Sequence, residues 1–172
     1  MNKLTALTIG ILSIACGVDS GKVQASLTPS SITNNQPPTL EQEAQQLYDR
    51  GQYTAAVELL KQIINNYVTQ GDRIGEAIAQ RNLALVYQGT GEWYQAEEAI
   101  AKSFNLLQQL ADSPERTRLW AQTLDVKGQL QLSTAQPEQA LVTWQQASDR
   151  YQQINDPTGY TRSQINQVQA GR

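Results

Sequence analysis

A short sequence pattern recurs at intervals of about forty residues, and this periodicity constrains the fold more than any other feature of the chain. The segment GQYTAA at residues 51–56 returns as GEWYQA at residues 91–96, forty residues later. A third copy, AQPEQA at residues 135–140, follows after forty-four residues. Each copy lies between two stretches whose apolar residues recur at spacings of three and four, the pattern of an amphipathic helix. The repeated unit is therefore predicted to be a helix, a tight turn and a second helix.

The residues of this pattern have physical reasons to be there. Gly51 and Gly91 can adopt the positive φ at which one helix ends and the chain reverses. A larger side chain than that of Ala56, Ala96 or Ala140 would hold the two helices of a unit apart.

The aromatic residue of the pattern supplies a large apolar body that can wedge between the paired helices. Tyr53 fills this position in the first copy and Trp93 in the second. The third copy differs, because Ala135 replaces the turn glycine and Pro137 replaces the aromatic residue. The geometry of the third turn is therefore not determined by the pattern.

Capping residues, glycine and proline divide the region from residue 39 onward into helices. Ser113 is a cap followed by Pro114 at the first helical position, and Asp156 and Pro157 repeat this arrangement. The predicted helices span residues 39–50, 53–68, 73–89, 92–111, 114–133, 137–154 and 157–170.

The second unit, Leu83-Ala84-x-x-Tyr87-x-x-x-Gly91-x-Trp93-x-x-Ala96, resembles the tetratricopeptide repeat. The first unit is similar through residues between Ala44 and Leu60, and the third through residues between Leu124 and Ala147. The resemblance implies an all-α fold in which antiparallel helix pairs stack as a right-handed α-solenoid. Three units and a terminal half repeat would then make up residues 40–172.

The long period suggests a more specific resemblance. A period of 40 to 44 residues exceeds the usual 34, and the longer repeat is similar to those that precede a CHAT domain, a caspase-like peptidase module, in bacterial proteins. The helix starts at Gly75 and Gly159 are also similar to that type. The catalytic His and Cys of that family would lie in a later domain, so the peptidase activity does not carry over to this sequence.

The first residues are typical of an exported protein. Lys3 is followed by an almost uncharged run from Leu4 to Cys16, which is too short to cross a membrane as a helix. A secretory signal peptide at residues 1–25, cleaved after Ala25, is expected, and residues 26–39 then form a flexible linker. The alternative is a lipoprotein signal that ends at Ala15, with Cys16 lipidated. The expected location is periplasmic or extracellular, or membrane-anchored if Cys16 carries a lipid.

Composition argues against most enzymatic chemistry. The chain has no histidine and a single cysteine, which removes the usual imidazole and thiolate groups. Lysine and arginine number 13 against 16 acidic residues and form no basic cluster, so nucleic acid is not an expected partner. Glu97 and Glu98 are adjacent on one helix and diverge, which does not suit an acid–base pair. We expect no catalysis, no cofactor and no metal.

Binding is the alternative to catalysis. In stacked helix pairs the first helix of each unit lines a concave groove that can hold a peptide. By the resemblance, the groove-facing residues are mostly neutral amides with scattered charge. They are Glu41, Gln45 and Tyr48 in the first unit, Arg81, Leu85 and Gln88 in the second, and Gln122, Asp125 and Gln129 in the third.

The sequence thus predicts a non-catalytic scaffold that binds a protein or peptide partner in this groove. The alternative is the recruiting or regulatory N-terminal part of a CHAT peptidase protein, without its catalytic domain. Contact with a membrane is expected only if Cys16 is lipidated. Self-association through the C-terminal half repeat is a further prediction, because half a repeat leaves an apolar face uncovered unless it caps the stack.

Overall fold

The computed structural model describes residues 38–171, and these residues form an all-helical structure. The predicted signal peptide, the alternative lipid site at Cys16 and most of the predicted linker lie outside the described residues. The described helices are α1 (Leu40–Asp49), α2 (Tyr53–Gln70), α3 (Arg73–Thr90), α4 (Trp93–Gln108), α5 (Pro114–Ser133), α6 (Pro137–Gln153) and α7 (Pro157–Ala170).

Each predicted helix is present, and the ends agree to within three residues. The capping residues explain this agreement. Ser113 accepts a hydrogen bond from the backbone of Arg116 at the start of α5, and Asp156 accepts one from Gly159 at the start of α7. The largest difference is at α4, which ends at Gln108 rather than at residue 111.

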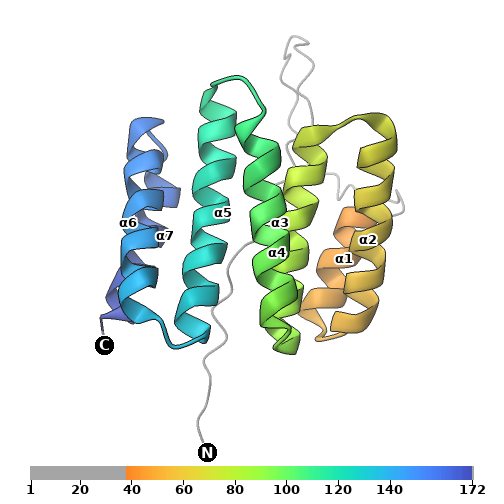
Figure 1. Ribbon diagram of the computed structural model, residues 1–172, viewed down its shortest axis with the longest axis horizontal. Helices are drawn as coiled ribbons and strands as arrows, with labels where there is room; N and C mark the ends of the chain where they lie inside the picture. Colours follow the sequence, from red (N-terminus) through yellow and green to blue (C-terminus); the bar gives the residue numbers. More distant parts are fainter. Residues whose placement is uncertain (1–37, 172) are drawn as a thin grey trace, which may run out of the picture.

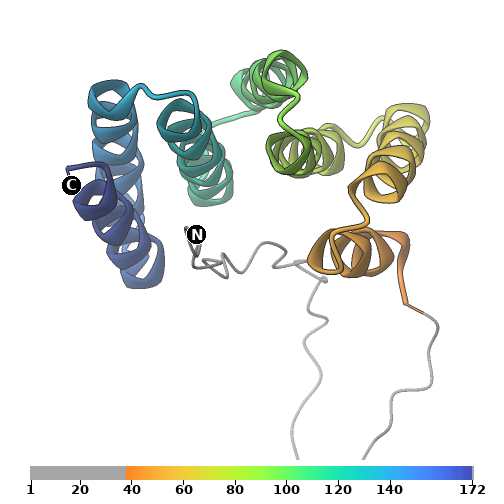
Figure 2. The ribbon, with the colours of Figure 1, turned by 90° about the horizontal axis from the view of Figure 1, so that it is seen from below.

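Successive helices pack as antiparallel neighbours, and from α3 onward the first helices of successive units also touch (Figure 1). α1 packs on α2, α3 on α4 and α5 on α6, while α7 packs on α6. In addition, α3 contacts α5, and α5 contacts α7. Viewed along the helices, the chain follows an open arc with α1 and α7 at its two ends (Figure 2).

The core lies between the paired helices, where the small residues of the repeated pattern sit. Ala56, Ala96 and Ala140 are all fully buried. Their small side chains let the two helices of each unit approach closely, as the sequence predicts, and larger apolar residues from neighbouring helices fill the space around them.

The three turns within the units share one backbone conformation despite their different sequences. Gly51 has a φ of 71°, Gly91 a φ of 76° and Ala135 a φ of 59°. Ala135 therefore adopts the left-handed conformation that glycine provides in the other two copies. Pro137 is the first residue of α6, where its fixed φ suits the start of a helix.

The junctions between units repeat as well. The ring of Tyr67, near the end of α2, lies against Gly75 of α3, and the ring of Tyr151 in α6 lies against Gly159 of α7. A Cβ atom at Gly159 would lie only 2.3 Å from the Tyr151 ring. The absence of a side chain at these two positions lets an aromatic ring fill the joint between a unit and the next helix.

Candidate functional site

The concave side of the arc contains a cavity of about 580 Å³, which we call the inner hollow. Its lining comes mainly from α1, α3, α5 and α7, the first helices of the successive units, with α2 contributing Leu60, Ile63 and Tyr67. These first helices run in the same direction, so equivalent positions of successive units lie side by side along the hollow.

The lining of the inner hollow is mostly apolar on α2 and α3 and mostly polar on α5 and α7. The apolar part includes Ile63 of α2 and Ile74, Ile78, Leu85 and Val86 of α3, whereas α1 contributes Ala44 together with the polar Glu41, Gln45 and Tyr48. Near α5 and α7 the lining includes Glu115, Arg118, Gln122, Asp156, Thr158 and Arg162. A ligand that lies across the helices would therefore meet both an apolar and a charged surface.

Six of the nine residues predicted to face a partner line the inner hollow. They are Glu41, Gln45, Tyr48, Arg81, Leu85 and Gln122. Gln88, Asp125 and Gln129 are not part of the lining. The side-chain amide of Gln88 donates to the backbone oxygen of Val126 at 3.2 Å, so it connects α3 to α5. Gln129 is half-buried on α5.

Asp125 is the centre of a buried network that joins α5, α6 and α7. Its side chain is 10% exposed. One carboxylate oxygen accepts hydrogen bonds from Tyr151 Oη at 2.9 Å and from Arg162 Nη2 at 3.1 Å, and the other accepts one from Ser163 Oγ at 2.7 Å. Burial raises the pKa of Asp125 above its ordinary value, and the surrounding donors oppose that rise.

The first unit contains the same tyrosine–carboxylate arrangement at the same separation. Tyr67 Oη donates to Glu41 Oε1 at 2.7 Å, and both tyrosines lie 26 residues after their acceptor. Partial burial raises the pKa of Glu41, but the hydrogen bond from Tyr67 and bonds at the helix start outweigh it and leave the pKa below its ordinary value. Burial and the bond to Glu41 raise the pKa of Tyr67 to about 12.

The middle unit breaks this arrangement. Glu41, Arg81 and Asp125 each lie ten residues before the turn residue of their unit, so they are equivalent positions. The position equivalent to Tyr67 and Tyr151 is occupied in the middle unit by Leu107. The middle unit therefore has a guanidinium where its neighbours have a carboxylate, and it has no tyrosine to face it.

Arg81 is almost completely buried in the wall of the inner hollow. Its side chain is 6% exposed, and its guanidinium donates to the amide oxygen of Gln122. Burial lowers the pKa of Arg81 to about 10, so the group remains positively charged at neutral pH. The adjacent Asn82 is 8% exposed, and its side-chain oxygen has no hydrogen-bond partner among the described residues.

Several residues of the hollow were not among the predicted site residues. Arg118 pairs with Asp156 at 3.3 Å, and Arg162 pairs with Asp125. Arg162 lies on α7, the predicted terminal half repeat. The repeat spacing could have identified Arg162 as a site residue. Arg162 occupies the position of its repeat that Gln122, a predicted site residue, occupies in the preceding one.

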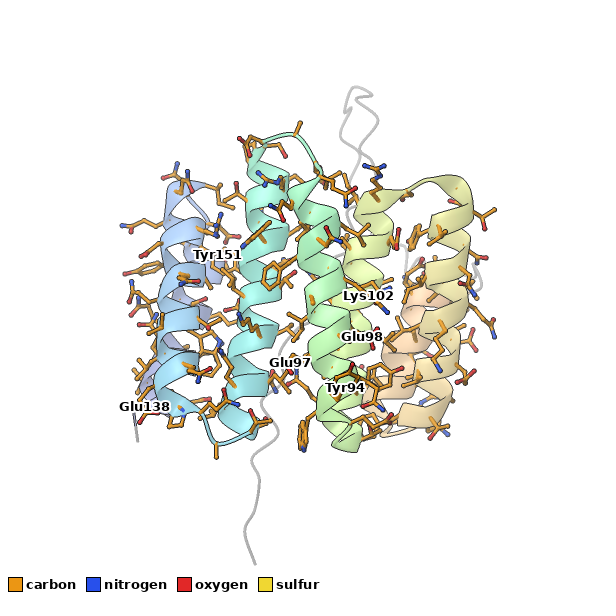
Figure 3. The ribbon with its side chains drawn as sticks, viewed as in Figure 1. Tyr94, Glu97, Glu98, Lys102, Glu138 and Tyr151 are labelled. Atoms are coloured by element: carbon orange, nitrogen blue, oxygen red, sulfur yellow. The ribbon has the colours of Figure 1, made fainter. Side chains whose placement is uncertain are left out.

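The outer face, formed by the second helices, is different in character. Figure 3 shows Tyr94, Glu97, Glu98 and Lys102 on α4, with Glu97 and Glu98 leaving the helix in different directions. Lys102 Nζ lies 2.9 Å from Glu98 Oε1. Both side chains of this pair are about half exposed, so the pair contributes little to stability.

The described residues hold neither a group of side chains arranged as metal ligands nor a helix that is both long and apolar enough to span a membrane. α7, the predicted half repeat, exposes the apolar residues Tyr160, Ile165 and Val168. Comparison with protein-family models gives no matching family, and a search of curated proteins gives no match.

Proposed function

We propose that this chain is a non-catalytic protein-interaction scaffold that binds a peptide or protein segment in the inner hollow. In this proposal the three helix pairs and α7 are tetratricopeptide-like repeats stacked as a right-handed α-solenoid. The observation that carries the proposal is the inner hollow itself, which four successive first helices line with an apolar and a charged end. Hollows of this size and mixed lining are typical of ligand-binding sites.

The lining chemistry supports a peptide ligand. Gln45 and Gln122 carry side-chain amides that can donate to and accept from a peptide backbone. The apolar surface on α2 and α3 can cover an apolar side chain, and such burial contributes about 25 cal/mol per Å² of surface removed from water. The amides can therefore orient an extended or helical segment, and the apolar surface can add to its affinity.

A blocking substitution tests this function. Gln45→Trp places an indole in the inner hollow, and Gln46→Trp places the same group on the exposed neighbouring position of α1. The full-length protein and both variants are applied to an array of immobilised short peptides of random sequence.

We expect the unaltered protein and Gln46→Trp to bind a common set of peptides that Gln45→Trp does not bind. Helicity by circular dichroism and the Tm of each variant show that the fold is retained. Absence of any bound peptide, or equal binding by Gln45→Trp, would contradict the proposal.

A further inference from the structure

Arg81 differs from the other arginines of the inner hollow in its lack of a carboxylate partner within the described part of the chain. Three arginines line the hollow. Arg118 has Asp156 as a carboxylate partner, and Arg162 has Asp125. Among the described residues no carboxylate forms a salt bridge with Arg81, whose side-chain partner is the neutral amide of Gln122.

A buried charge of this kind is costly unless an opposite charge compensates it. Removing a guanidinium from water carries a desolvation penalty that a single bond to a neutral amide repays only in part. Electrostatically, Arg162 lowers the pKa of Arg81 and Asp125 raises it, so the two groups act on this guanidinium in opposite directions. The guanidinium of Arg81 therefore places a positive charge in the wall of the hollow that has no ion-pair partner among the described residues.

The repeat comparison shows that this charge is specific to the middle unit. At the equivalent position the first and third units carry Glu41 and Asp125, each bonded to a tyrosine of its own unit. In the middle unit neither the carboxylate nor the tyrosine is present. Tyrosines of the first and third units bond the carboxylates of Glu41 and Asp125. The guanidinium of Arg81 keeps N–H donors without a partner in residues 38–171, and these donors line the hollow.

We propose that the inner hollow selects a partner segment with an acidic side chain, whose carboxylate binds the guanidinium of Arg81. This inference deepens the proposed function and rests on it. A carboxylate matches the planar guanidinium in shape and charge. Asn82 is adjacent in the chain, and the partner's backbone can supply an N–H donor for its unpartnered oxygen. The apolar lining from α2 and α3 then lies beside the acidic anchor, so an apolar residue near the acidic one completes the match.

Gln122→Glu provides the sharpest test, because it gives Arg81 an internal carboxylate. The internal pair should raise the Tm of the protein while competing with the partner's carboxylate. The matched control is Gln108→Glu, which adds the same charge at an exposed position of α4. The probes are pairs of fluorescent peptides from the bound set of the array, with Glu or with Gln at one position and an amidated C-terminus. Affinity is measured by fluorescence polarisation with the full-length chain.

For the unaltered protein and Gln108→Glu we expect the Glu peptide to bind about tenfold more tightly than its Gln counterpart. In Gln122→Glu this preference should vanish while the Tm rises, a combination that misfolding does not produce. Arg81→Lys, which keeps the charge but not the planar geometry, should retain part of the preference.

The outcomes separate this inference from the proposed function. If peptides bind in the hollow but Glu and Gln versions bind equally, the acidic anchor is wrong and the scaffold function stands. If only peptides with a free C-terminal carboxylate bind, the anchor is a chain end and the side-chain assignment is overturned. If no peptide binds, the scaffold function itself fails.

Discussion

Tyr151 Oη donates a hydrogen bond to Asp125 Oδ2 at 2.9 Å, deep between α5, α6 and α7. Arg162 Nη2 contacts both groups, at 2.6 Å from Tyr151 Oη and 3.1 Å from Asp125 Oδ2. The last helix is thus held by a polar network as well as by the Tyr151 ring, which lies against Gly159. Because Arg162 also lines the inner hollow, the same network positions part of the candidate site.

Tyr151→Phe is expected to destabilise the protein through this network. The substitution keeps the ring but removes one donor to Asp125 and one acceptor for Arg162, both in a buried setting. Loss of a buried hydrogen bond to a charged group costs about 1–3 kcal/mol. Tyr67→Phe removes the equivalent hydroxyl from a more exposed site and should cost less. Urea unfolding, followed by circular dichroism, measures the free energy of unfolding of both variants. An equal or larger loss of this free energy for Tyr67→Phe would contradict the network's role.

The contributions of Asp125 and Glu41 to the stability of the fold are expected to change with pH in opposite directions. The pKa of Asp125 is raised in the folded protein, so its contribution to stability is greatest below the ordinary value of 3.8 and is lost as pH rises through the folded-state pKa. The pKa of Glu41 is lowered, so its contribution is present above the ordinary value of 4.5 and is lost as pH falls through the folded-state pKa.

The measurement is the difference in free energy of unfolding between the unaltered protein and each amide variant over a range of acidic pH. Relative to Asp125→Asn, the stability of the unaltered protein should fall as pH rises. Relative to Glu41→Gln it should rise. The same sign for both differences would show that the two equivalent carboxylates have similar environments.

The helices could be predicted from the sequence because their ends depend on local chemistry. Ser113, Asp156, Pro114 and Pro157 act within one turn of the chain, so their effects can be read without knowing the fold. The site was predicted only in part, because the partners of Asp125 come from residues 26 to 38 positions away. Helical periodicity places Asp125 on α5, but Tyr151 and Ser163 become visible as its partners only when α6 and α7 pack against it.

Ala135→Gly is expected to stabilise the protein. Ala135 has a φ of 59°, and the left-handed conformation costs a residue with a Cβ about 1–2 kcal/mol. Glycine avoids that strain but loses more conformational entropy on folding, about 0.5–1 kcal/mol. The net gain should be about 0.5–1 kcal/mol, measured as a rise in the free energy of unfolding. Gly91→Ala is the reverse change at the equivalent turn and should lower it, and a loss of stability in Ala135→Gly would show that the turn is not strained.

Gly159→Ala is expected to loosen the attachment of α7. The new methyl group would lie 2.3 Å from the Tyr151 ring, which is itself fixed by its bond to Asp125, so either the ring or the helix must move. Forcing an extra carbon into a packed joint costs about 1–3 kcal/mol. Thr158→Ala changes the exposed neighbour in the same helical turn and serves as the control. Hydrogen exchange should be faster in α7 of Gly159→Ala and unchanged in α1 and α2. Unchanged exchange in α7 would mean that the joint can accept a side chain, and that the close contact of Tyr151 with this helix is not what holds it.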